Sequence, residues 1–378
     1  MKKGTLQEMV KDGNNKLILR QLREKPCSRA EIAQVTGLAR STVTTLTKEL
    51  ISQGQIQEVG TEAAPVGRSP ILLDLVPDYR YMMGILFHRK EIAVCVSDLR
   101  MQCLETRTLP IDRVESAQQA AKWAFDNGRQ IFESHDIPWD RCAGIGINSP
   151  GPLNSKTGEI LNPPEFTLFH GFNPAEFLSG LCDLPITVSN SPVLMAVTET
   201  QRHRSRENFL FVVVDRGVGA AIVQDGRVYR GVNGLAGEFG HMSIDPNGEP
   251  CACGNRGCLE KYISHSALSA RFGMESYRDT ADRACDGDPK ALAVLDHVAG
   301  CLATAIANAV NLLDLDLVLM AGELNHRSEF LFPRIQEQVR QRILRPDTFP
   351  LRILPSDVTK DGDISYITAI ALQNYFQP

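Results

Sequence analysis

The spacing of apolar residues predicts a short helical head followed by a long α/β body. Three stretches of the head, at residues 15–24, 29–35 and 41–53, repeat apolar positions at helical spacing. From about residue 79 onward, apolar runs of strand length alternate with amphipathic helical stretches, which is typical of an α/β architecture. The 378 residues exceed what one compact core usually holds, so we expect more than one domain.

Local signals mark the ends of the head helices. Pro26 ends the first helix, and Ser28 forms a capping box with Glu31 at the start of the second. Gly37 supplies the left-handed residue that ends the second helix. Two helices joined by a turn that contains glycine are typical of the helix-turn-helix unit.

The third helix has an apolar stripe and an opposite polar face. Val43, Leu46 and Leu50 form the stripe, so the small polar residues near the start of this helix face away from the core. At this place a recognition helix contacts base edges in the major groove of DNA. We therefore predict DNA contacts by Arg40, Ser41, Thr42, Thr44, Thr45 and Lys48. The alternative is a three-helix packing module that does not bind DNA.

A predicted hairpin comes after the third helix. Residues 55–60 and 70–76 have strand patterns, and the segment between them carries Arg68 near its tip. Such a hairpin is a wing, from which an arginine can enter the minor groove, although a solvated loop charge is the alternative for Arg68 alone. Residues 1–60 carry ten Lys or Arg against six Asp or Glu, whereas the whole chain has a net charge of -5. This asymmetry indicates a separate partner for the head.

The body has the pattern of two α/β lobes that face a cleft. Successive strand patterns at residues 82–87, 92–99 and 103–111 predict a meander. The remaining patterns are a helix at 118–132, strands at 142–152 and 184–192, a strand pair at 208–226, a long apolar helix at 292–313 and a strand at 315–324. No internal repeat is visible in the sequence.

A cluster of cysteines predicts a zinc site. Cys251, Cys253 and Cys258 lie within eight residues, and glycines between them let the backbone turn tightly. A tetrahedral Zn²⁺ site needs a fourth ligand, and His241 is the nearest candidate upstream. The alternative is a turn with three free thiols.

The other seven cysteines are scattered, mostly among apolar residues, as expected of buried thiols in a reducing compartment. The first residues lack the apolar stretch of a signal peptide, and no uncharged apolar run approaches the ~20 residues that a bilayer requires. We therefore expect a cytoplasmic protein without a membrane segment.

The segments at residues 237–242 and 251–260 together resemble the signature of the ROK family (repressors, open reading frames and sugar kinases). The resemblance implies a two-lobed, actin-like (ribonuclease H-like) sugar-kinase fold of the α/β class, preceded by an α+β winged helix-turn-helix domain. It implies a DNA-binding domain at 1–76, a first lobe at 79–190 with a returning C-terminal helix at 363–378, and a second lobe with the zinc loop at 191–362.

The positions that resemble the kinase motifs of the family lack the residues that phosphoryl transfer requires. In the first phosphate loop, Leu86 replaces a carboxylate, and His88 and Arg89 replace two glycines. Ser191 stands where the family has its catalytic aspartate, and Asp215 stands in the second phosphate motif. The adenosine motif is reduced to residues 321–323. The resemblance therefore implies a protein that is not an enzyme.

The sugar side of the family pattern is better matched. The family's sugar ligands correspond to Asn190, Glu238, His241 and Glu260, with Asn162 as a further match. The resemblance gives His241 two roles, with one ring nitrogen on zinc and the other facing the sugar. Glu238 and Glu260 can alternatively cap helices. Residues 88–90 offer basic side chains for a sugar phosphate, or form a solvated turn.

The leading hypothesis is a transcriptional repressor of sugar-utilisation genes that binds a sugar or sugar phosphate in a catalytically dead kinase cleft. One winged helix covers one half-site, so we expect a homodimer or homotetramer on operator DNA. An active ATP-dependent sugar kinase with a DNA-binding head is one alternative, and a regulator controlled by a protein partner is another.

Overall fold

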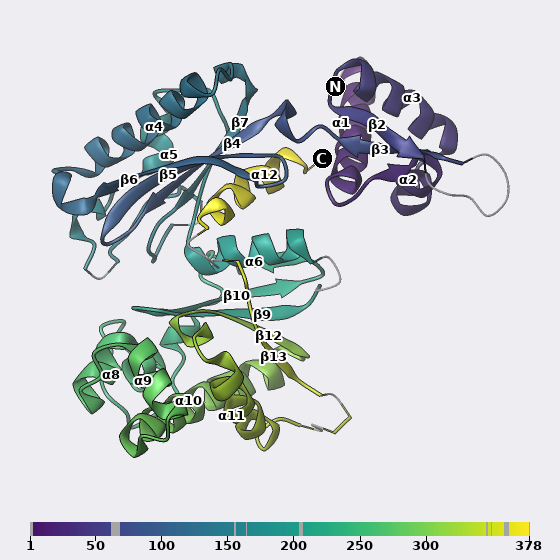
Figure 1. Ribbon diagram of the computed structural model, residues 1–378. Helices are drawn as coiled ribbons and strands as arrows, with labels where there is room; N and C mark the ends of the chain where they lie inside the picture. Colours follow the sequence, from purple (N-terminus) through teal and green to yellow (C-terminus); the bar gives the residue numbers. More distant parts are fainter. Residues whose placement is uncertain are drawn as a thin grey trace. The chain divides into compact units, whose positions relative to one another are not determined.

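Two compact units make up the computed structural model of the protein (Figure 1). The structure describes residues 3–61, 69–154, 156–163, 165–203, 207–344, 347–348, 350–358 and 363–377. The first unit comprises Met1–Leu153, Thr157–Ser189 and Ile367–Pro378, and the second comprises Asn154–Lys156 and Asn190–Tyr366. Each unit is described by itself.

The head, at the start of the first unit, is a winged helix. Its helices are α1 (Lys3–Leu22), α2 (Arg29–Thr36) and α3 (Arg40–Ser52). A small antiparallel sheet has the order β1-β3-β2, with β1 (Cys27–Ser28), β2 (Ile56–Thr61) and β3 (Ile71–Leu75). Ile18, Leu22, Ile32, Val43 and Leu50 are completely buried and form its core.

The head confirms most of the local predictions and corrects one. Ser28 and Glu31 form both hydrogen bonds of the capping box, and Gly37 ends α2 with a φ of 71°. The apolar pattern predicts a first helix that starts near Asn15, but α1 starts at Lys3. The part of α1 before Asn15 contains Gly4 and Gly13, and the helix has little amphipathic pattern, so no local signal indicates a helix there.

The rest of the first unit is a lobe, here called the first lobe, built on a sheet of order β6-β5-β4-β7-β8. The predicted meander is β4 (Tyr81–Phe87), β5 (Glu91–Asp98) and β6 (Cys103–Pro110), and β7 (Cys142–Asn148) and β8 (Ile186–Ser189) run parallel to β4. Helices α4 (Ala117–Ser134) and α5 (Pro174–Ser179) lie on one side of this sheet in Figure 1, and α12 (Ala369–Tyr375) lies on the other.

The alternation of side chains along β4 explains this layering. Met83 points toward α4, where a side chain on Gly128 would collide with it. The next residue, Gly84, faces the segment before α12, and an added Cβ there would lie 3.0 Å from Thr368. On β7, a side chain on Gly146 would collide with the backbone oxygen of Ile367. The C-terminal segment therefore packs directly against the backbone of the sheet.

The second unit, here called the second lobe, repeats the strand order of the first. Its sheet runs β11-β10-β9-β12-β13, with an antiparallel meander followed by two parallel strands. The strands are β9 (Phe209–Val214), β10 (Val218–Gln224), β11 (Arg227–Tyr229), β12 (Leu317–Gly322) and β13 (Arg352–Pro355). The helices are α6 (Ser191–Arg202), α7 (Glu260–Ile263), α8 (His265–Phe272), α9 (Tyr277–Cys285), α10 (Pro289–Leu313) and α11 (Ser328–Arg340).

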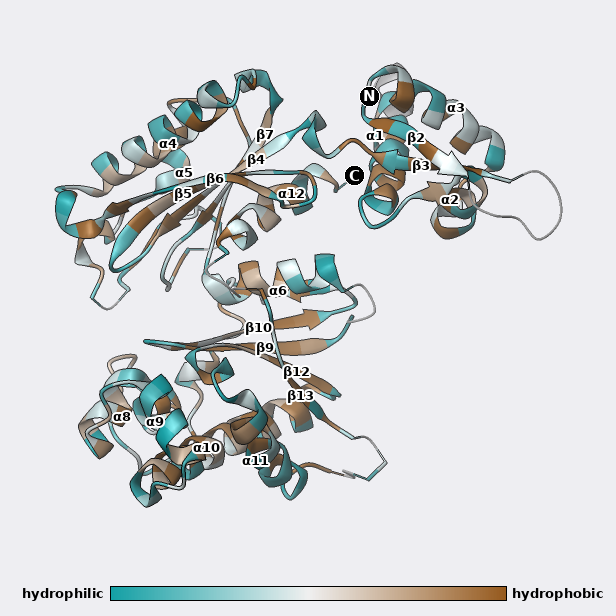
Figure 2. Ribbon diagram, in the orientation of Figure 1, coloured by the Kyte–Doolittle hydropathy of each residue, from teal (hydrophilic) through white to brown (hydrophobic). Residues whose placement is uncertain are grey.

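Among the described residues, α10 is the helix that is long and apolar enough to cross a membrane. The apolar window is 61% buried, and residues such as Val298, Leu302 and Ile306 are completely buried in the core of the second lobe. Figure 2 shows the same helix and the neighbouring strands as largely apolar. A buried core helix meets the length and composition test for the same reason that a membrane helix does, so α10 gives no support for a membrane segment.

Candidate functional site

Four predicted metal ligands converge in the second lobe. The ligand atoms of His241, Cys251, Cys253 and Cys258 all lie within 4.8 Å of one another. Cys251 Sγ is 3.8 Å from His241 Nδ1, and Cys253 Sγ is 3.6 Å from Cys258 Sγ. Zn–S and Zn–N bonds of about 2.3 and 2.0 Å place tetrahedral ligands roughly 3.5–3.8 Å apart, so these separations fit one Zn²⁺ ion.

The backbone of the loop holds the cysteines in place. Cys251 N–H donates to Asn255 O over 2.8 Å, and Ile244 N–H donates to Gly257 O over 2.8 Å. Gly257 has a φ of 64°, and a side chain on it would collide with the backbone oxygen of Asp245. Only glycine allows this approach, so the motif glycine is part of the geometry of the cluster.

The electrostatics of the cluster favour a bound cation. Burial and the neighbouring sulfurs raise the pKa of Cys258 to about 12, whereas a backbone hydrogen bond from Asn255 lowers the pKa of Cys253. Three thiolates so close together repel one another, and a divalent cation removes that repulsion by coordinating all of them. The donor set of one imidazole and three thiols is one that Zn²⁺ prefers.

Two carboxylates lie near His241. Glu238 precedes the short 3-10 helix Phe239–His241, and burial by the surrounding protein raises the pKa of its carboxyl although part of the side chain is exposed. His241 lowers that pKa and Glu260 raises it, which means that the three charges act on one another. Because Nδ1 of His241 faces Cys251, Nε2 on the opposite side of the ring is available for a second partner.

Glu260 has a role that sequence reasoning missed. Its Oε2 accepts the backbone N–H of Val218 over 2.8 Å, and a Cβ on Gly217 would lie 2.9 Å from the same oxygen. The carboxylate therefore ties the end of the cysteine-containing loop to the turn between β9 and β10. The two residues are 42 positions apart, and no local pattern in the sequence signals such a pair.

The two asparagines of the predicted sugar site lie in different units. Asn190 is the N-cap residue of α6 and makes no side-chain capping hydrogen bond. It belongs to the second unit, as do Glu238, His241 and Glu260. Asn162 is exposed and belongs to the first unit. The structure thus brings Glu238, His241 and Glu260 together and leaves Asn162 in a separate part of the chain.

Three segments resemble the kinase nucleotide motifs: two are hairpin turns, and the third leads from β12 into a 3-10 helix. His88 N–H donates to Glu91 O over 3.0 Å and closes the β4–β5 turn, in which Lys90 is exposed. Asp215 N–H donates to Gly217 O over 2.9 Å in the β9–β10 turn. After β12, Glu323 begins a 3-10 helix, Glu323–Asn325. Each turn carries charged side chains where a phosphate-binding loop presents bare backbone N–H groups.

The predicted DNA-contact residues lie on the exposed face of α3. Its apolar stripe is buried, Thr42 is half-buried, and the exposed predicted residues are Arg40, Ser41, Thr44, Thr45 and Lys48. The hydroxyls of Thr44 and Thr45 donate to backbone carbonyls one turn earlier, over 2.8 and 3.1 Å. Their oxygens keep acceptor capacity for a base or phosphate partner. Arg68 lies outside the described residues.

Arg29 links the recognition helix to the wing, and sequence reasoning did not single it out. Its Nε donates to Thr47 Oγ1 over 3.1 Å, and its Nη2 lies 3.2 Å from Glu58 Oε1 on β2. Thr47 is completely buried on the core side of α3. The arginine therefore fixes α3 relative to the strand that leads into the wing, and in the sequence it looks like any surface charge.

Comparisons with known proteins agree with this architecture. The ROK family model matches residues 82–371, and a model for winged helix-turn-helix DNA-binding domains matches residues 11–57. The chain is 28% identical to the DNA-binding transcriptional dual regulator NagC of Escherichia coli, over 93% of this chain and 90% of the relative. It is 26% identical to the xylose repressor of Bacillus spizizenii, over 98% and 97% of the two chains.

Solved structures show the same relationship. A ROK family transcriptional regulator, described as a homolog of the E. coli MLC protein, superposes with a TM-score of 0.82 at 26% identity over 97% of both chains. A ROK hexokinase from Thermus thermophilus gives a TM-score of 0.65 at 23% identity, over 77% of this chain and 97% of the hexokinase, and shows the shared fold of the body. The protein therefore belongs to the ROK family and carries a winged helix-turn-helix segment ahead of its sugar-kinase-like body.

Proposed function

We propose that the protein is a DNA-binding transcriptional repressor controlled by a sugar or sugar phosphate. The observation that carries the proposal is the exposed polar face of α3 on a winged helix joined to a ROK body. The relatives that match along nearly the whole chain are regulators, and their names include N-acetylglucosamine and xylose repressors. The proposal assigns base contacts to Ser41, Thr42, Thr44 and Thr45, and phosphate contacts to Arg40 and Lys48.

The zinc loop supports the effector site in this proposal. One Zn²⁺ bound by His241, Cys251, Cys253 and Cys258 crosslinks the loop and fixes the ring of His241. Neighbouring hydroxyls of one pyranose then find hydrogen-bond donors and acceptors on Glu238, Glu260 and Nε2 of His241. Asn190 and Asn162 complete the proposed ligand set, and the basic turn at residues 88–90 is the proposed partner of a phosphate group.

We further propose that the protein does not phosphorylate sugars. Ser191 cannot accept a proton from a sugar hydroxyl at neutral pH as an aspartate does. Asp215 repels phosphate, and the side chains of His88 and Arg89 obstruct the backbone approach that a phosphate loop needs. ATP-dependent turnover of N-acetylglucosamine or xylose by the purified protein would contradict this proposal and favour the kinase alternative.

The proposed repressor acts in the cytoplasm as a homodimer or homotetramer. One winged helix reads one half-site, and two heads related by a two-fold axis read a pseudo-palindromic operator. The regulator names of the relatives and the burial of α10 in the core of the second lobe support this assignment.

Selection of bound sequences from random duplex DNA, using the full chain, tests the proposed DNA-binding function. We expect a pseudo-palindromic consensus, and we expect Thr45→Ala to relax specificity at one position of each half-site by ~1–3 kcal/mol. Lys48→Ala should weaken binding to all DNA sequences alike and make the affinity less dependent on salt concentration. Ser52→Ala, at the far end of the same exposed helix, is the matched control. Failure to select any consensus would overturn the function.

A further inference from the structure

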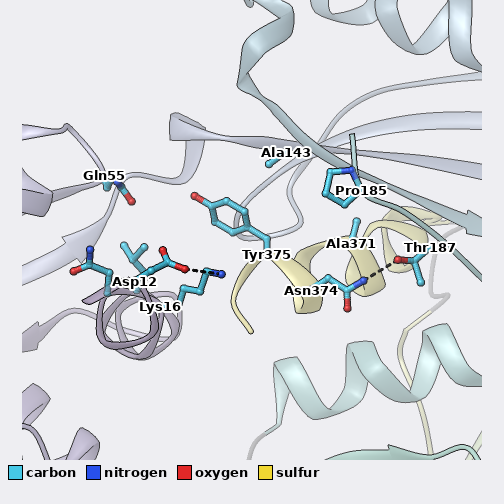
Figure 3. A pocket seen from close by; sticks show the side chains of 11 residues that line it. Asp12, Lys16, Gln55, Ala143, Pro185, Thr187, Ala371, Asn374 and Tyr375 are labelled. Carbon is cyan, nitrogen blue, oxygen red and sulfur yellow. Dashed lines mark hydrogen bonds and ion pairs between the residues drawn. The ribbon is translucent and has the colours of Figure 1, made fainter. Parts of the chain in front are cut away.

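The C-terminal turn of the chain lies between the first lobe and the head. Asn374, near the end of α12, donates from Nδ2 to Thr187 Oγ1 of β8 over 2.7 Å, which anchors the helix to the lobe. Figure 3 shows Tyr375 extending from α12 toward Gln55 of the head, in the pocket that Asp12 and Lys16 of α1 also line. Phe376 comes next and is only 4% exposed. All of these residues belong to the first unit.

The head offers a matching surface along one side of α1 and just past its end. The Arg23 guanidinium lies over the ring of Phe376, 5.4 Å from its centroid. Asp12, Asn15, Lys16 and Leu19 extend at helical spacing toward the start of the helix and line the same pocket as Tyr375. We call these five head residues the tail-docking surface. Arg80, in the linker after the head, hydrogen-bonds to the Tyr375 hydroxyl.

The junction is incompletely packed. A cavity of about 370 Å³ lies between the tail-docking surface and the lobe, lined by Gln55, Ala143, Pro185 and Ala371 as well as by the residues named above. Asn15 Oδ1 is buried and has no hydrogen-bond partner among the described residues. Permanent cores are closely packed and leave few polar atoms unpaired, whereas this junction contains a partly open pocket and one unpaired amide oxygen. The junction therefore has the character of a contact that opens and closes.

A second attachment holds the other side of the head. Arg100, in the β5–β6 turn, pairs with Asp74 of β3 over 2.5 Å, and Leu99 N–H donates to Pro77 O over 3.1 Å. These contacts lie next to the covalent linker and fix the base of the wing. The contact of Arg23 with Phe376 is a further contact between the head and the first lobe.

We propose that the tail-docking surface of the head binds the C-terminal turn Asn374–Phe376 of the same chain as a reversible clamp, and that this clamp sets the orientation of the DNA-binding head. The partner is this segment because its ring already lies against Arg23 and its helix is anchored at Thr187. The part of the proposal that concerns DNA rests on the proposed repressor function, whereas the clamp itself does not.

Hydrogen exchange of the full, zinc-loaded chain tests the clamp without DNA. A cation–π contact of about 0.5–1 kcal/mol corresponds to a two- to fivefold change in the docking equilibrium. We expect Phe376→Ala to speed exchange of α1 amides by about that factor, although the substitution lies more than 350 residues away in sequence. Arg23→Ala should likewise speed exchange of α12, and the double variant should add little.

Matched controls keep the result decisive. Phe272→Ala removes a partly exposed ring in the other unit, and Arg113→Ala removes an exposed arginine of the first lobe, so both should leave α1 and α12 unchanged. Additive effects of Arg23→Ala and Phe376→Ala would overturn the clamp. So would α1 exchange in Phe376→Ala equal to that of the wild type. Arg23 lies on the head side of the contact, so Arg23→Ala breaks the same contact without changing a side chain of the lobe. It therefore tests the clamp even if Phe376→Ala disturbs the lobe.

Operator spacing tests the consequence for DNA. A clamped head fixes the distance between half-sites, so wild-type affinity should fall when one or two base pairs are inserted between them. Phe376→Ala should reduce that discrimination by about two- to fivefold. An unchanged spacing preference together with faster α1 exchange would reject the orienting role and keep the clamp. Absence of any operator binding would instead reject the repressor function.

Discussion

The two lobes share one strand order and differ in the segment that comes after the third strand. In the first lobe the chain passes from β6 through a single 3-10 turn into α4, whose apolar face closes the sheet. In the second lobe, residues 230–259 lie between β11 and α7 and contain the four converging metal ligands. The two lobes share a common frame, and the inserted loop of the second lobe adds a group of residues that could hold a metal ion.

The turns between the first two strands sharpen this contrast. The β4–β5 turn of the first lobe carries His88, Arg89 and Lys90, whereas the β9–β10 turn of the second carries Asp215 and is tied to the zinc loop through Glu260. One turn is basic and the other has an acidic group and a carboxylate contact. Because Arg216 follows Asp215, the second turn lacks the net positive charge of the first, and the two equivalent turns cannot hold the same phosphate group in the same way.

Removal of the metal should give the largest difference between the lobes. Structural zinc contributes on the order of 10 kcal/mol in small zinc peptides, so Cys251→Ala should lower the melting temperature of the second lobe more than any other change below. The first lobe should keep its stability. Metal analysis should find one zinc per wild-type chain, and Cys285→Ala, an exposed cysteine of the same lobe, should keep it. Well under one zinc in the wild type would refute the site.

The opposite experiment destabilises the first lobe without touching the metal. An added methyl on Gly146 collides with the Ile367 backbone, so Gly146→Ala should cost about 1–3 kcal/mol and displace the segment before α12. Zinc content should stay at one per chain. Gly144→Ala is the control, because its Cβ would meet Pro185 O at 3.3 Å and needs only a small shift. Urea denaturation distinguishes the two, and equal losses would contradict the packing described for this face.

Effector binding should depend on the zinc-loop side. Loss of one charge-assisted hydrogen bond costs ~1.5–3 kcal/mol, so Glu238→Gln should weaken sugar binding roughly ten- to hundredfold and leave DNA binding intact. Calorimetry with N-acetylglucosamine, xylose and their phosphorylated forms measures this. Glu275→Gln, an exposed carboxylate of the same lobe, should have no effect. Equal affinities in wild type and Glu238→Gln would remove Glu238 from the pocket.

Arg89→Ala tests the basic turn of the first lobe in the same assay. A side chain that binds phosphate contributes only to the binding of phosphorylated ligands. The substitution should therefore weaken binding of the sugar phosphate and leave binding of the free sugar unchanged. Equal effects on both forms would show that the turn only supports the fold, and the difference in charge between the two turns would then have no role in ligand choice.

The smallest expected effect is a dependence of the second lobe on pH. Burial lowers the pKa of His297 below 6.5, so folding favours its neutral form. The resulting stability is complete above pH 6.5 and is lost as the pH falls below that value. Denaturation midpoints at several pH values should show a shallower acid loss in His297→Gln than in the wild type.

Local patterns predict much of this structure, and long-range contacts explain what they miss. The capping box and the cysteine cluster are readable because their partners lie within about ten residues of one another. The first half of α1 and the pairing of Glu260 with Val218 are not, because tertiary packing decides them. The repeated strand order leaves no trace in the sequence, since a sheet constrains hydrophobic alternation rather than residue identity.

The placement of α12 has a consequence for how the chain folds as it is made. Asn374 bonds to Thr187, 187 positions earlier, and the ribosome needs roughly 10–40 s to add that many residues. During this interval the C-terminal segment that packs against the sheet face around Gly84 and Gly146 has not yet been made, whereas Asn190–Tyr366, most of the second unit, is synthesised as one continuous segment. The lobe whose synthesis starts first is therefore completed last, and until then one face of its sheet is exposed apolar surface of the kind that favours aggregation.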